Sequence, residues 1–198
     1  KPENFSLHLN DYLDRLTNAF KDDLIRKIEI LSEDLINTWE KNNQVFICGN
    51  GGSAANAIHI ANDLHYGLGV NANRDGKGLK VEALPANSAV ITCLANDFGY
   101  EQWMQKAVEM YHNDNDILFL ISSSGNSQNV INACNFANDI GIDTITFTGF
   151  NPDNGLRSIG KYNFWVDSKS YNIVENIHQI WILTIVDAII GKSEYSAS

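Results

Sequence analysis

Two pairs of acidic and imidazole side chains are spaced for shared chemistry. His59 and Asp63 stand four residues apart, and Glu175 and His178 stand three apart, each pair in a segment with helical spacing of apolar residues. Residues at these spacings lie on one face of a helix. The sequence therefore offers Asp63, Glu175 and His178 as candidate proton-transfer groups, and these three with His59 as candidate Zn²⁺ ligands. An ordinary surface or core pair has the same spacing.

Two short turns are rich in glycine and serine. Residues 49–53 read GNGGS and residues 122–127 read SSSGNS, and each turn lies between an apolar segment and a helical one. The N-terminus of a helix presents free N–H groups and the positive end of its dipole. Gly51 and Gly52 let the backbone approach a ligand, and hydroxyl groups donate to several oxygens of one phosphate. The turns predict a phosphate cradle, although helix capping alone would also use such residues.

Neither turn matches a nucleotide-binding pattern. The G-K-[ST] ending of a P-loop and the complete G-x-G-x-x-G fingerprint are both absent from the sequence. We therefore expect no nucleotide cofactor and a small phosphorylated ligand instead.

The elements that position these turns alternate between strand and helix. Strands are predicted over residues 44–48, 81–84, 116–121, 144–148 and 162–166, with a loop over 66–80 and a last helix over 173–190. Alternation of this kind predicts an α/β fold, a three-layer doubly wound sandwich of the flavodoxin-like type with a mainly parallel sheet. We expect a single domain over residues 1–198, with a helical part over 1–43 and an α/β core over 44–192.

The amino-acid composition indicates which binding partners and which cellular compartment to expect. The net charge is −10, with 24 acidic against 14 basic residues and no basic cluster, which argues against nucleic acid as a partner. Polar residues interrupt the last apolar segment, and no signal peptide is recognised, so no membrane association is expected. Three single cysteines in apolar surroundings favour the reducing cytoplasm. Apolar side chains along residues 1–43 exceed what one domain needs to bury, which favours association.

Three motifs together resemble the sugar isomerase (SIS) domain family, and within it the phosphoheptose isomerases. They are residues 49–59 (GNGGSAANAIH), 95–99 (ANDFG) and 121–127 (ISSSGNS). The resemblance implies conversion of sedoheptulose 7-phosphate to an aldoheptose phosphate for surface polysaccharide, in a homotetramer. It also implies that the phosphate is held by Ser53, Ser122, Ser123, Ser124 and Ser127, and that sugar hydroxyls contact Asn50 and Asp97.

The sequence departs from this family at the acid–base positions. Asp63 stands where the family has a longer Glu, Glu175 where it has Gln, and Leu183 where it has His. A leucine neither moves a proton nor binds a metal. Two interpretations stay open: proton transfer has moved to Glu175 and His178, or the chain is a non-catalytic SIS protein that binds a sugar phosphate or a partner protein.

Overall fold

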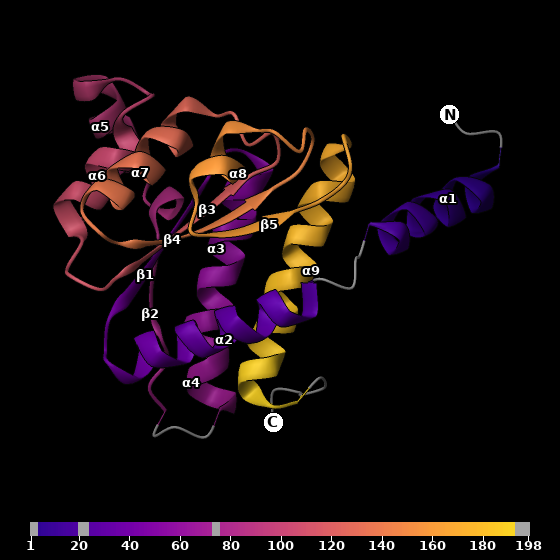
Figure 1. Ribbon diagram of the computed structural model, residues 1–198, viewed down its shortest axis with the longest axis horizontal. Coiled ribbons are helices and arrows are strands. Elements are labelled where there is room, and N and C mark those ends of the chain that lie inside the picture. The colour runs from indigo at the N-terminus through magenta and orange to yellow at the C-terminus, as the bar shows by residue number, and fades with distance from the viewer. Residues whose placement is uncertain (1–3, 20–23, 73–75, 193–198) are drawn as a thin grey trace.

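A five-stranded parallel sheet forms the centre of the protein (Figure 1). The computed structural model describes residues 4–19, 24–72 and 76–192. The strand order is β2-β1-β3-β4-β5, and every pair of neighbours is parallel. The strands are β1 (Gln44–Gly49), β2 (Lys80–Ala83), β3 (Ile117–Ser122), β4 (Asp143–Thr148) and β5 (Tyr162–Trp165). The predicted α/β class and parallel sheet are confirmed.

Strands β1 and β3 are mostly apolar because both faces of the sheet are covered. All six residues of β3 are buried, and so are the last five of β1. Continuous apolar runs are typical of parallel strands between two helical layers. Within the sheet, Phe46 of β1 pairs with Leu118 of β3, and Gly49 pairs with Ile121. This register brings the turns that follow the two strands to the same edge.

Helices cover both faces and complete the three-layer sandwich. One core cluster joins Leu35, Ile60 and Trp181 to the sheet. These residues come from helices α2 (Leu24–Glu40), α3 (Gly52–Asn62) and α9 (Tyr171–Ile190), which lie together in Figure 1. The opposite face is covered by α5 (Ser88–Phe98), α6 (Trp103–Tyr111), α7 (Gln128–Asp139) and α8 (Gly155–Ile159).

Helix α9 is long and apolar because it is a core helix. By length and composition it is the one described helix that could cross a membrane, with a mean hydropathy of 1.5 over its best window. Its buried residues, among them Ile177 and Ile182, pack in the core cluster shared with the sheet and α2. Core packing thus accounts for its apolar face.

The N-terminal helix α1 (Phe5–Asn18) projects away from the rest of the fold (Figure 1). None of its described side chains is buried, and Phe5, Leu9 and Leu13 are exposed. Tyr12 joins it to α9, because the hydroxyl accepts a hydrogen bond of 2.8 Å from Asn176 Nδ2. Helices α1 and α2 both lie within the N-terminal part, residues 1–43, that was predicted to be helical.

The structure differs from the predicted elements at two places. The loop expected over residues 66–80 begins later, since a π-helical turn η1 (Asp63–Gly67) and helix α4 (Leu68–Asn71) extend the chain beyond α3. Leu64 and Leu68 are fully buried there, so core packing outweighs the weak helix propensity of the Gly- and Asn-rich sequence. The second difference is the short helix α8 (Gly155–Ile159), which was not predicted. Residues 73–75 of the expected loop lie outside the described part.

Candidate active site

The two glycine- and serine-rich turns meet at the carboxyl edge of the sheet. One turn follows β1 and the other follows β3, and the order β2-β1-β3 makes this the point where the chain changes direction across the sheet. Open α/β sheets bind their ligands in the crevice at such a switch point. The topology thus places both predicted halves of the cradle at the position where a ligand site is expected.

The first turn is shaped by Gly51. Its φ of 56° lies in the left-handed region, where a residue with a side chain is strained, and α3 begins at the next residue. Ser53 is buried in the first turn of that helix, and its N–H donates to the carbonyl of Asn50 at 3.0 Å. The positive end of α3 is therefore directed at the edge of the sheet.

The second turn is braced by its own hydroxyls. Ser122 Oγ accepts from the Gly125 N–H at 3.2 Å, and Ser124 Oγ accepts from the Asn126 N–H at 3.2 Å. Ser123 differs, because its buried hydroxyl makes no hydrogen bond within the described part of the chain. A buried hydroxyl without a partner is costly unless a ligand completes it. The hydroxyls of Ser123 and Ser124 can still donate their protons to an anion, whereas that of Ser122 donates to Ser127 Oγ at 3.4 Å.

A cavity of about 240 Å³ joins the two turns to α9. It gathers every predicted substrate-binding residue except Asp97, and it adds Tyr171 and Glu175 from α9. The residues that line it are Asn50, Gly51, Gly52, Ser53, Ile121, Ser122, Ser123, Ser124, Ser127, Tyr171 and Glu175. Hydroxyl groups and backbone N–H groups thus surround the cavity, and the carboxylate of Glu175 also lines it.

Asp97 is placed elsewhere. It is exposed on α5, where its carboxylate accepts from Asn96 Nδ2 at 2.9 Å, and it does not line the cavity. Asp97 lies near the C-terminal end of α5 (Ser88–Phe98), and its contact with the sugar stays a prediction.

Two residues that the sequence analysis did not single out fix Asn50. Its side-chain amide and that of buried Asn129 form a reciprocal pair, with hydrogen bonds of 2.9 and 3.0 Å. The hydroxyl of Tyr100 donates to the same Asn50 oxygen at 3.0 Å. The Asn50 oxygen therefore accepts from two protein donors, and one hydrogen of its NH₂ group is donated to Asn129, which leaves the second N–H to bind a ligand. Tyr100 and Asn129 lie 50 and 79 residues from Asn50, so only the fold reveals the contact.

Glu175 is the acid that reaches the cradle. Its carboxylate packs directly on Gly52, so closely that a Cβ at that position would collide with it. Asn56 of α3 donates to the Glu175 backbone carbonyl at 2.9 Å and ties α9 to α3 at this point. Desolvation raises the pKa of Glu175 above its ordinary value. A carboxyl group with a raised pKa keeps its proton to a higher pH, which suits it to both take and return protons.

A groove between α3 and α9 continues from the cradle. It has a volume of about 360 Å³ and shares Gly52 and Glu175 with the cavity, and its other lining residues are Ala55, Asn56, His59, Asn176 and Gln179. His59 Nε2 lies 3.1 Å from Asp63 Oδ2, so the predicted pair forms. The cradle, Glu175 and this imidazole thus lie along one continuous depression.

His178 does not face the site, which corrects the prediction for this residue. It is fully buried on the sheet side of α9, with Nε2 donating to the Thr148 carbonyl at 3.1 Å and the rings of Phe147 and Trp181 beside it. Burial lowers its pKa to about 4, partly opposed by the hydrogen bond to Thr148. His178 is a neutral core residue and cannot contact a ligand in the cavity.

The four candidate zinc ligands are not brought together. Among the described residues, no group of three or more His, Cys, Asp or Glu side chains is placed to hold a metal ion. His59 and Asp63 form a pair, Glu175 lies on Gly52, and His178 is enclosed in the core. Leu183 packs against the same core. The residues therefore do not fit the predicted zinc site.

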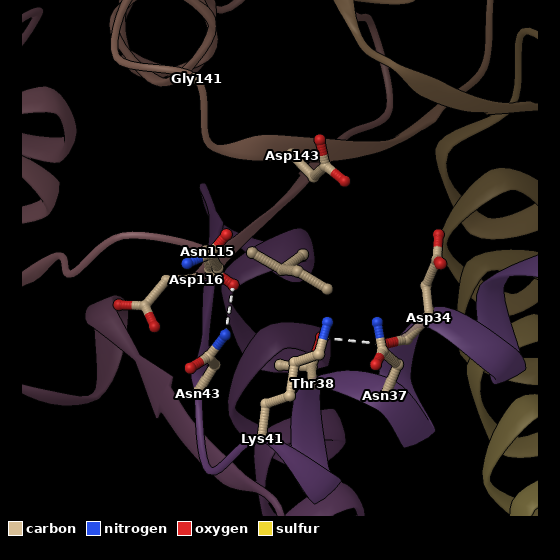
Figure 2. Close-up of a pocket in the computed structure, with 10 residues that line it drawn as sticks. Asp34, Asn37, Thr38, Lys41, Asn43, Asn115, Asp116, Gly141 and Asp143 are labelled. Carbon is tan, nitrogen blue, oxygen red and sulfur yellow. Dashed lines mark hydrogen bonds between the residues drawn. The ribbon is translucent and has the colours of Figure 1, made fainter.

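A second polar hollow lies at the end of the sheet where the strands begin, opposite the phosphate cradle (Figure 2). Its lining includes Asp116, whose carboxylate accepts from the backbone N–H groups of Gln44 and Asn113 at 2.9 and 2.8 Å. Asn43 Nδ2 donates to the Asn115 carbonyl at 3.0 Å, as Figure 2 shows. These polar groups hold the starts of the strands together, so their chemistry is structural.

Known proteins match both the sequence and the fold. The family described as "SIS domain" matches residues 8–149. Phosphoheptose isomerase of Helicobacter pylori (strain P12) is 33% identical over 91% of this chain and 95% of its own length. That of Aliarcobacter butzleri (strain RM4018) is 33% identical over 86% and 92%.

A solved structure agrees with these relatives. Phosphoheptose isomerase from Neisseria gonorrhoeae superposes with a TM-score of 0.81 at 26% identity, covering 93% of this chain and 95% of the other. The fold, the cradle motifs and near full-length similarity thus point the same way. The chain belongs to the SIS domain family and, within it, to the phosphoheptose isomerases.

Proposed function

We propose that this protein isomerises sedoheptulose 7-phosphate to an aldoheptose 7-phosphate, with Glu175 as the principal proton-transfer group. The observation that carries the proposal is the shared cavity: Glu175 and the serines of both turns line the same space. The family membership of the chain supports this substrate class.

The phosphate is proposed to lie between the two turns. Ser123, Ser124 and Ser127 donate to its oxygens from one side, and the first turn of α3 presents Ser53 and the positive end of the helix dipole from the other. An acidic protein with a net charge of −10 repels anions at long range. Local donors of this kind are therefore what makes phosphate binding favourable.

Proton transfer is proposed to occur where the cavity opens into the groove between α3 and α9. Isomerisation requires removal of a proton from one carbon next to the carbonyl and its return to the other, through an enediol. Glu175 lines both hollows and has a raised pKa, which suits it to carry that proton. The reaction is redox-neutral overall and needs no nucleotide cofactor. His59 lines the groove and is paired with Asp63, which supports a role for this pair in proton exchange with the oxygens of the sugar.

The cellular setting is proposed from composition and family. We infer a cytoplasmic homotetramer that supplies heptose for lipopolysaccharide or capsule, with no nucleic acid or membrane partner. The exposed apolar residues of α1, such as Phe5 and Leu13, support an association in which a second copy covers this helix. Light scattering of the purified protein tests the assembly.

Product analysis tests the reaction. Incubation with sedoheptulose 7-phosphate should yield aldose signals in the ¹H and ¹³C NMR spectra. Fructose 6-phosphate is the matched control, because it offers the same phosphate and ketose groups on a shorter chain. Binding of the heptulose phosphate without any product would contradict the isomerase and support the non-catalytic interpretation, which the leucine at position 183 favours.

A further inference from the structure

Tyr171 is a large aromatic side chain that stays exposed at the edge of the phosphate cradle. It is the first residue of α9, and it is 61% exposed although it lines the cavity between the two turns. Among the described residues that line this cavity, it is the only aromatic one. Removing an aromatic ring from water is favourable, and ligand cavities commonly use such rings as contact surfaces. Tyr171 is therefore a candidate ligand contact.

The Tyr171 ring is supported by Phe150, which follows the end of β4. The two ring centroids lie 4.8 Å apart and the ring planes meet at 70°, the edge-to-face arrangement that aromatic pairs favour. Phe150 is itself partly buried against the core cluster of the sheet and α9. The core thus supports one side of the Tyr171 ring through Phe150, while the rest of the ring remains open to solvent.

Phe150 is held in a strained backbone conformation. Its φ of 55° lies in the left-handed region, which a bulky residue rarely adopts. Hydrogen bonds on both sides hold the turn: the Phe150 N–H donates to the Ser168 carbonyl at 2.9 Å, and the Gly149 N–H donates to the Ser123 carbonyl at 3.0 Å. Strained residues of this kind are concentrated at ligand sites. The turn that supports Tyr171 is thus bonded directly to the phosphate cradle.

Tyr171 and Glu175 lie on the same face of α9. They stand four residues apart on this helix, and both line the cavity. The serine hydroxyls of the cradle provide polar donors for a phosphate group, whereas the Tyr171 ring provides apolar surface. The C–H groups of a carbon chain can pack against such a surface, and a phosphate group gains nothing from it. The ring therefore suits the part of the ligand that joins the phosphate to the reacting carbons.

We infer that Tyr171 is a specificity-determining residue whose ring, supported by Phe150, packs against the carbon chain of a sugar phosphate. Hydroxyl donors and the dipole of α3 bind any phosphate group, with or without a chain. The ring lets the cradle distinguish a phosphate ester of a polyhydroxy chain from inorganic phosphate. This inference rests on the proposed function for the choice of ligand, but the contact itself requires no turnover.

Calorimetric binding of two unreactive probes tests this contact. Sorbitol 6-phosphate has a polyhydroxy chain but no carbonyl group, so it cannot be isomerised, and inorganic phosphate has no chain. The unaltered protein should bind sorbitol 6-phosphate more tightly than inorganic phosphate. Tyr171→Ala should raise the Kd for sorbitol 6-phosphate about tenfold and leave the Kd for inorganic phosphate unchanged. An unchanged Kd for sorbitol 6-phosphate, or an equal rise for both probes, would overturn the inference.

Tyr171→Phe separates the ring from its hydroxyl group. This variant keeps the aromatic surface, so both Kd values should match those of the unaltered protein. A loss as large as that in Tyr171→Ala would assign the effect to the hydroxyl and overturn the role of the ring. Retained binding of inorganic phosphate shows in each variant that the cradle is still folded.

Phe150→Leu tests the support of the ring. Leucine keeps an apolar side chain in the same left-handed conformation but removes the edge-to-face contact. The Kd for sorbitol 6-phosphate should rise about threefold. Adding Tyr171→Ala should raise it only to the value of Tyr171→Ala alone, because Phe150 acts through Tyr171. Multiplied losses in the double variant would overturn the positioning role of Phe150.

Tyr111→Ala is the matched control. Tyr111 is likewise an exposed tyrosine, at the end of α6, and it does not line the cavity. Both Kd values should be unchanged in this variant, and a loss like that in Tyr171→Ala would overturn the assignment. Because neither probe reacts, ring-dependent binding without turnover of sedoheptulose 7-phosphate would count against the proposed isomerase alone.

Discussion

The two faces of helix α9 show how one segment can serve the core and the site with similar residue types. The face toward the sheet carries His178, which is fully buried between aromatic rings. The face toward α3 carries Glu175 and Gln179, which are only partly buried and line the groove. Helical spacing groups residues on a face, but packing decides whether that face meets solvent, ligand or core.

The two faces of α9 also differ in the direction in which they shift the pKa of their ionisable residues. Burial lowers the pKa of His178 to about 4 and keeps it neutral, whereas desolvation raises the pKa of Glu175. Asp187, farther along α9, also has a raised pKa, because of desolvation first and the nearby Asp63 charge second. Both faces disfavour charge. Only Glu175 also adjoins the phosphate cradle, where a proton can be passed to a ligand.

The largest expected effect comes from removing the acid on the groove face. Glu175→Gln keeps the shape but cannot transfer a proton, so kcat should fall by about 10²–10⁴-fold with little loss of heptulose phosphate binding. Initial rates and calorimetric binding separate the two quantities. The control is Glu33→Gln, an exposed acid on α2 outside the cavity, which should keep full activity. Undiminished turnover in Glu175→Gln would clear this residue.

Because His178 is buried on the core face of α9, the free energy of unfolding should depend on pH. Between pH 6.5, the ordinary pKa of His178, and its folded value of about 4, the unfolded chain binds a proton that the folded chain does not. The free energy of unfolding should therefore fall as the pH drops through this range, by roughly 3 kcal/mol in total from this residue.

His178→Gln isolates that contribution. Glutamine can still donate to the Thr148 carbonyl but does not titrate, so the difference in pH dependence between the two proteins reports His178 alone. Urea titrations at several pH values measure it. If the free energy of unfolding depends on pH in the same way for both proteins, the burial of a neutral imidazole is contradicted. A folded His178→Gln variant that loses activity at neutral pH would contradict the placement of His178 outside the site.

The cradle should show a smaller effect, confined to binding. Ser124→Ala removes one hydroxyl donor to a charged phosphate, which is worth about 1.5–3 kcal/mol, so Kd should rise roughly ten- to a hundredfold. The control is Ser32→Ala on α2, whose hydroxyl donates to the Ile28 carbonyl of its own helix at 2.8 Å. Isothermal calorimetry with heptulose phosphate compares the two. Equal affinities would remove Ser124 from the cradle.

No effect is expected from removing metal ions. Because His178 is enclosed and the remaining candidates do not gather, turnover should be the same after dialysis against EDTA and after addition of Zn²⁺. Inductively coupled plasma mass spectrometry of the purified protein checks that the metal has been removed. Loss of activity with EDTA and its recovery with Zn²⁺ would show that the groove closes around an ion.

The sequence predicted the cradle because its signals are local. Each turn directly follows a strand, and parallel strands end at one edge, so Ser53 and Ser124 had to lie close together. The orientation of His178 was not predictable, because the three-residue spacing from Glu175 does not determine which side of α9 packs against the sheet. Asn129 was missed for a related reason, since its partner lies far away in the sequence and becomes a neighbour only through packing.

Solvent exchange tests the central claim, that Glu175 moves a proton between neighbouring carbons of a heptulose phosphate. The protein is incubated with sedoheptulose 7-phosphate in D₂O, and deuterium on the carbons next to the carbonyl is followed by NMR for the unaltered protein and for Glu175→Gln. We expect deuterium and aldose signals to appear together with the unaltered protein and to be lost in the variant. Aldose formation at the same rate in both proteins, or bound substrate with neither deuterium nor aldose, would contradict the account.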